Sequence, residues 1–153
     1  MDQVEQTTAP ATAAPKSLYV VGVLAVLWNC FGAYDYIMTR LRDTAHLSMV
    51  GNPNELLAYI DAFPIWAQIG WGLGVWGGLA GSILLLLRSR HAVPTFAVSL
   101  VGMALSFGYQ YVGPPAPAAM TEGPMAYFPL VIIAIGIALF VYARAMRMKG
   151  VLR

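Results

Sequence analysis

Charged residues are scarce in this chain. Asp, Glu, Lys and Arg make up 10% of its 153 residues and hydrophobic residues make up 59%, whereas soluble domains usually contain about 25% charged residues. A soluble fold of this size could not hide so much apolar surface. The composition therefore excludes a soluble domain. The net charge is only +2, and basic residues do not cluster among aromatic ones, so we expect no nucleic-acid partner.

Cysteine and histidine are scarce as well. Cys30 is the single cysteine, which excludes an intramolecular disulfide and indicates a thiol buried in the membrane. His46 and His91 fall in loops that we predict on opposite sides of the membrane, so they cannot share a metal ion or a haem. The sequence has no catalytic nucleophile motif and no phosphate-binding loop. We expect no metal, no cofactor and no enzymatic activity.

Long apolar runs dominate the sequence instead. Four of them approach the roughly 20 residues needed to cross a bilayer, namely residues 18–38, 64–87, 93–112 and 126–145. They predict an all-α integral membrane protein, a four-helix bundle of two antiparallel hairpins over residues 17–147 that contacts the lipid bilayer. Residues 1–16, rich in Ala, Thr and Pro, are expected to form a disordered cytoplasmic tail. Residues 148–153 are expected to extend the last helix as a basic cytoplasmic tail.

The basic residues predict the orientation. With four spans, both termini lie on the same side as the loop between the second and third spans, and seven of the nine basic residues fall there: Lys16, Arg88, Arg90, Arg144, Arg147, Lys149 and Arg153. Arg40 and Arg42 fall on the other side. Cytoplasmic loops are enriched in Lys and Arg, so the bias predicts cytoplasmic termini.

The first outer loop contains a helix signal. Asn52 is a typical cap, Pro53 suits the first helical position and Glu55 follows the cap by three residues. The apolar residues that follow share one helical face: Leu56, Leu57, Ile60 and Phe63. We predict a short amphipathic helix that lies on the outer membrane surface.

A weak repeat relates the two hairpins. The segment FGAYDYI beginning at Phe31 is similar to FGYQYV beginning at Phe107, and FPI at Phe63 is similar to FPL at Phe128. The pattern is compatible with a parallel internal duplication. It is also compatible with coincidence, because aromatic residues at interfaces and Pro in first helical turns are common.

Small residues form two stripes in the second span. Gly70, Gly74, Gly78 and Ser82 recur every four residues, and Gly77 and Gly81 lie beside them. Such stripes let helix backbones approach closely. They are compatible with packing inside one bundle, or with docking of a second copy or a partner helix. Asn29, in the middle of the first span, is expected to make an interhelical hydrogen bond.

Polar and aromatic residues gather at the outer ends of the spans. They predict an outward-facing pocket formed by Tyr34, Asp35, Tyr36, Gln68, Tyr109, Gln110 and Tyr111, with Asp35 as its only charge. An aromatic belt with ordinary helix ends is the alternative, in which Asp35 is a helix-end carboxylate near Arg40. The outer-loop residues Asp43, His46, Glu55 and Asp61 are expected to be solvated.

Three segments carry a family resemblance: WNCFGAYDYIMTRLRDTAHL from Trp28, the second and third spans from Phe63 to Met103, and the terminal YARAMRMKGVLR. They resemble an uncharacterised family of small four-span proteobacterial inner-membrane proteins, some of which carry an automatic "sugar transporter" label. The resemblance implies a multi-pass protein of the bacterial inner membrane and assigns no site residues.

Two functional hypotheses follow. The first is a non-enzymatic accessory subunit whose glycine stripes bind another copy or a larger membrane complex. The second is an oligomeric transporter of a small, sugar-like solute that enters at the outward-facing pocket. The inner halves of the spans contain no charged residue, which argues mildly against a carrier that is polar toward both faces.

Overall fold

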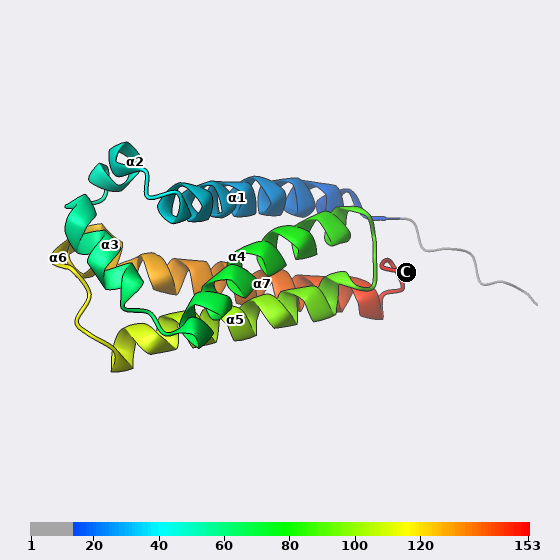
Figure 1. The fold of residues 1–153 in the computed structure, drawn as a ribbon. Coiled ribbons are helices and arrows are strands. Elements are labelled where there is room, and N and C mark those ends of the chain that lie inside the picture. The colour runs from blue at the N-terminus through cyan, green and yellow to red at the C-terminus, as the bar shows by residue number, and fades with distance from the viewer. Residues whose placement is uncertain (1–13) are drawn as a thin grey trace, which may run out of the picture.

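The computed structural model describes residues 14–153, so most of the predicted tail over residues 1–16 lies outside the described part. Four long helices, α1 (Lys16–Arg40), α4 (Ile65–Leu86), α5 (Ala92–Val112) and α7 (Phe128–Met148), run side by side in alternating directions (Figure 1). Each is long and apolar enough to cross a membrane, the fourth when counted from Gly123. The prediction of an all-α membrane bundle is confirmed.

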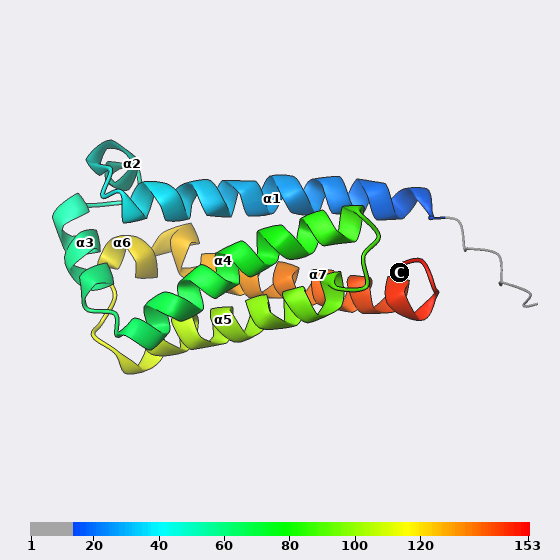
Figure 2. The same ribbon diagram turned by 45° about the vertical axis from the view of Figure 1, so that its right-hand side comes forward.

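The bundle has two different ends. Helix α4 packs between α1 and α5, and α5 also packs on α7 (Figure 2). The end at which α1 begins and α7 finishes is called the terminal end here. The opposite loop end holds the short helices α2 (Thr44–Ser48), α3 (Pro53–Asp61) and α6 (Ala118–Thr121) and the 3-10 helix η1 (Gly123–Tyr127).

Glycines bring α4 and α5 into backbone contact. A Cβ atom added at Gly102 of α5 would lie 2.5 Å from both the Gly70 carbonyl oxygen and the Gly74 nitrogen of α4. Gly77 and Gly81 also face α5, whereas Gly78 faces α1, where a Cβ would collide with the Asn29 side chain. Both small-residue stripes of α4 therefore pack against helices of the same chain.

The terminal end is a closed apolar core. Leu18, Leu85, Phe96 and Ala143, one from each long helix, are fully or almost fully buried there. Two residues of the C-terminal segment, Val151 and Leu152, are buried in the same core.

This segment differs from the basic helical tail that the sequence predicted. Helix α7 ends at Met148, and Gly150 has a φ of 68°, a left-handed conformation that reverses the chain. The Arg153 backbone then closes two hydrogen bonds of 2.7 Å, from its N–H to the Arg88 carbonyl and from the Arg90 N–H to its own carbonyl. The reversal lets the apolar side chains at positions 151 and 152 leave water.

Helix α3 begins where the sequence predicted, because the Asn52 side chain accepts a hydrogen bond of 3.0 Å from the Asn54 N–H. Its apolar face, however, is buried within the protein rather than laid on a membrane surface. Leu56 and Tyr59 are buried, and Tyr59 packs with Phe63 and Ala67 in a small core at the loop end. Helix α3 therefore covers the loop end of the bundle.

Candidate ligand cavity at the loop end

A cavity of about 600 Å³ lies between the four long helices and reaches the short helices α2 and α3. We call it the bundle cavity. Its size falls within the range of about 300–1,000 Å³ that is usual for small-molecule sites. Most of its lining is apolar, with Phe107 and Ile132 as examples. Phe96 and Leu139 line it and also belong to the core of the terminal end, so the cavity stops at that core.

A hydrogen-bonded carboxylate–imidazole pair lines the cavity toward the loop end. Asp35 Oδ1 lies 2.8 Å from His46 Nε2. The His46 side chain is 10% exposed and the Asp35 side chain is 48% exposed, so the pair joins a covered imidazole to a carboxylate that reaches solvent. The ring of Tyr34 meets the imidazole edge-on, with centroids 5.6 Å apart.

Helix α2 positions the imidazole. The chain turns after α1 at Arg42, which has a left-handed φ of 58°. The Asp43 side chain then caps α2 by accepting a hydrogen bond of 2.7 Å from the His46 N–H. The spacing of three residues from Asp43 to His46 is the usual capping distance, and it is the sequence signal for this helix.

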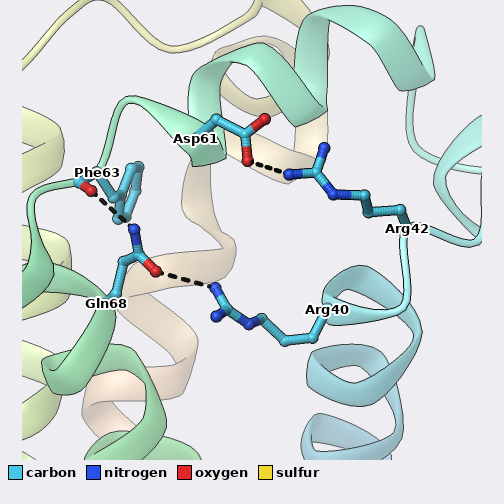
Figure 3. Close-up of polar contacts among 5 residues, drawn as sticks. All are labelled: Arg40, Arg42, Asp61, Phe63 and Gln68. Carbon is cyan, nitrogen blue, oxygen red and sulfur yellow. Dashed lines mark hydrogen bonds and ion pairs between the residues drawn. The ribbon is translucent and has the colours of Figure 1, made fainter.

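The structure corrects two expectations about the outer loop. His46 was expected to be solvated, but α2 folds back over α1 and covers its side chain. Arg40 was the expected neighbour of Asp35, but its guanidinium donates to Gln68 Oε1 at 3.1 Å, while Arg42 pairs with Asp61 at 2.7 Å (Figure 3). Gln68 in turn donates to the Phe63 carbonyl oxygen at 2.9 Å (Figure 3).

The predicted pocket residues fall into two groups. Tyr34, Asp35 and Gln110 line the bundle cavity. Four others do not line it: Tyr36, Gln68, Tyr109 and Tyr111. Tyr36 packs edge-on against Trp71 at 4.8 Å, Tyr109 donates a hydrogen bond of 2.9 Å to the Ala62 carbonyl, and Tyr111 is 81% exposed. The three residues of the first group belong to the candidate site. The four residues of the second group lie outside it, at the loop end.

Deeper polar groups of the cavity are bonded within the bundle. Asn29 donates from Nδ2 to Ser82 Oγ at 3.1 Å, an interhelical contact between α1 and α4, and to the Ala25 carbonyl at 2.9 Å. Ser99 of α5 donates to the Gly74 carbonyl at 2.6 Å. These residues therefore hold the helices together and leave the Asp35–His46 pair as the charged feature of the lining.

Two buried polar atoms of the lining differ from these hydrogen-bonded groups. His46 Nδ1 and the Tyr59 hydroxyl have no hydrogen-bond partner within residues 14–153. Both residues line the cavity, and Tyr59 is 6% exposed. Burial raises the pKa of Tyr59 above its usual value, and the neighbouring Tyr109 raises it further, so the side chain stays a neutral phenol. The sequence signal for Tyr59 was its position on the apolar face of α3, between Leu56 and Phe63.

Across residues 14–153, no three His, Cys, Asp or Glu side chains lie close enough to hold a metal ion. No family model, curated protein or solved structure matches the chain. The interpretation of the cavity therefore rests on its geometry and chemistry.

Proposed function

We propose that this membrane protein binds a small amphiphilic molecule in the bundle cavity. The observation that supports this function best is the combination of an apolar cavity of about 600 Å³ with a single carboxylate–imidazole pair toward its loop end. Apolar walls favour the hydrocarbon part of a ligand, and a few convergent polar groups orient its polar end.

The arrangement also supports entry from the loop end. The half-exposed Asp35 carboxylate lines the cavity, whereas the buried core around Leu85 and Phe96 closes the terminal end. Seven of the nine basic residues lie on the terminal side, which favours a cytoplasmic terminal end. We therefore propose that the ligand enters from the outer side of a bacterial inner membrane.

Binding fits the structure better than the interaction-subunit hypothesis. That hypothesis depended on free glycine stripes, but Gly70, Gly74 and Gly81 face α5 and Gly78 faces α1. A second copy or a partner complex would have to dock on another surface. Transport of the bound molecule would additionally require the core at the terminal end to open, so binding is the simpler function.

The proposal is tested by filling the cavity without disturbing the packing. Gly32 lines the cavity, and a Cβ added there meets no atom within 4 Å, so Gly32→Leu should occupy ligand space. Gly108 has equally free surroundings but does not line the cavity, which makes Gly108→Leu the matched control. Trp28 and Trp71 line the cavity, so a bromine-bearing ligand should quench their fluorescence.

We expect ω-bromododecanol to quench the tryptophan fluorescence of the detergent-solubilised protein in a saturable manner. Gly32→Leu should lose the saturable component, because its side chain takes the place of the ligand, and Gly108→Leu should keep it. Equal saturable quenching in all three proteins, or none in the wild type with any amphiphile of this chain length, would refute the proposal.

A further inference from the structure

We propose that the ligand of the bundle cavity is a lipophilic cation, an amphiphile whose ammonium group lies beside Asp35. This inference rests on the proposed binding function and adds the charge of the ligand. It follows from the ionisable groups of the lining, from the hydrogen bonding of the two His46 ring nitrogens and from the aromatic residues around the cavity.

Among the described residues, the lining contains one acidic side chain, Asp35, and one imidazole, His46. Asp35 contributes a carboxylate, and within residues 14–153 no Lys, Arg or Glu lines the cavity. The two arginines of the loop end are engaged elsewhere, Arg40 with Gln68 and Arg42 with Asp61. A positive group in the cavity would therefore meet a carboxylate and no basic competitor except His46.

Among residues 14–153, the covered ring nitrogen of His46 has no partner for a second N–H. A neutral ring that donates from Nε2 to Asp35 leaves Nδ1 as a bare acceptor, whereas an imidazolium would carry a second N–H there. Nδ1 is buried and has no partner within the described residues, and burying an unpaired charged donor is more costly than burying a lone pair. With a neutral ring, the Asp35–His46 pair keeps one negative charge, which a cationic ligand would balance.

Aromatic rings also line the cavity. Rings from all four long helices line the cavity, with Trp28 on α1, Trp71 on α4, Phe107 on α5 and Phe128 on α7 among them. The Trp28 and Phe128 ring centroids lie 6.3 Å apart, so these two rings join α1 to α7 at the cavity wall. Aromatic faces attract Lys, Arg and quaternary ammonium groups more strongly than neutral groups of similar size.

Other head groups fit less well. A carboxylate would lie near Asp35 with no basic side chain to balance it, and like charges at close range repel. A hydroxyl could donate a hydrogen bond to Asp35 or bond to Gln110, which both line the cavity, but a neutral group leaves the negative charge of the carboxylate unbalanced. The Asp35 side chain, which is about half exposed, is the charged group that a ligand reaches without rearrangement.

Three probes of one chain length separate these possibilities: ω-bromododecyl trimethylammonium, ω-bromododecanol and ω-bromododecanoate. Saturable quenching of tryptophan fluorescence gives the affinity of each for the solubilised full-length protein. We expect the ammonium probe to bind about ten-fold more tightly than the alcohol and the carboxylate probe to bind most weakly. Asp35→Asn should abolish the preference for the ammonium probe and preserve binding of the alcohol.

Glu55→Gln is the matched control, because Glu55 is an exposed acid of the loop end that does not line the cavity. It should leave all three affinities unchanged. Equal affinity for the ammonium and alcohol probes, or a preference for the carboxylate, would overturn the cation inference and leave the binding function standing. Saturable binding of none of the three would overturn both. The comparison of probes on the wild type decides the question even if Asp35→Asn does not fold.

Discussion

The two halves of the bundle differ in how tightly the four long helices pack. At the terminal end, the long helices converge on a closed apolar core, and even the C-terminal residues Val151 and Leu152 are buried in it. At the loop end, the same helices surround a cavity of about 600 Å³ that α2 and α3 cover. The difference suggests that the terminal half fixes the fold and the loop half is available for binding.

The contact between α4 and α5 joins the two halves. It follows glycines on both helices, so the backbones approach along most of the bundle length. Because α4 is held tightly against α5 and also packs on α1, the space on the side of α7 can stay open without loosening the bundle. We therefore expect substitutions at this contact and at the terminal end to lower the free energy of unfolding more than substitutions in the cavity lining.

The largest effect is expected at the glycine contact. Gly102→Ala would place a methyl group 2.5 Å from backbone atoms of Gly70 and Gly74, and backbone cannot move aside as a flexible side chain can. We expect a loss of about 3 kcal/mol in the free energy of unfolding, seen as a lower yield of folded protein and a lower melting temperature in detergent. Gly108→Ala, with no atom within 4 Å of its added Cβ, should behave as the wild type. Similar melting temperatures for both variants would contradict the close-contact interpretation.

An intermediate effect is expected from matched truncations in the two halves. Leu85 is fully buried in the core of the terminal end, whereas Ile132 is partly buried and lines the cavity. Leu85→Ala should cost about 2 kcal/mol through lost packing contacts. Ile132→Ala should cost about 1 kcal/mol or less, because its side chain already lacks neighbours on one side.

Thermal unfolding of the two purified variants under identical detergent conditions measures this difference. An Ile132→Ala variant as unstable as Leu85→Ala would show that the loop half is packed as tightly as the terminal half. That result would remove the distinction on which the binding proposal depends.

The smallest effect is expected at Tyr59. Tyr59→Phe removes a buried hydroxyl that has no partner within residues 14–153, so the variant should be as stable as the wild type or up to about 1 kcal/mol more stable at neutral pH. Because burial raises the pKa of Tyr59 above 10.0, the unfolded chain loses this proton at lower pH than the folded one. Wild-type stability should therefore fall relative to the variant as the pH rises above about 10.

Unfolding followed at neutral and alkaline pH for both proteins checks the sign of this effect. A variant that is clearly less stable than the wild type at neutral pH would mean that the Tyr59 hydroxyl is hydrogen-bonded in solution. Helix α3, which covers the cavity, would then be held by a further hydrogen bond.

Part of the site could be predicted from the sequence and part could not. Asp35, Tyr34 and Gln110 stand at the ends of apolar spans, where a polar residue is conspicuous, and the structure places all three in the cavity lining. His46 and Tyr59 were not among the predicted pocket residues. Each lies in a short connecting helix, and whether such a residue faces water or the bundle depends on how the connection folds back, which residue spacing does not specify.

The sequence by itself determined the number of membrane helices, their approximate ends and the start of α3. Long apolar runs, a proline and a capping asparagine act locally, so they need no knowledge of the neighbouring helices. The tertiary structure alone decided which helices the glycine stripes contact and where Asp35 finds its partner. It also decided that α3 covers the cavity and that Val151 and Leu152 join the core. These outcomes depend on contacts between residues far apart in the chain, such as Gly78 with Asn29 and Arg153 with Arg88, because helix packing fixes them only once the bundle has formed.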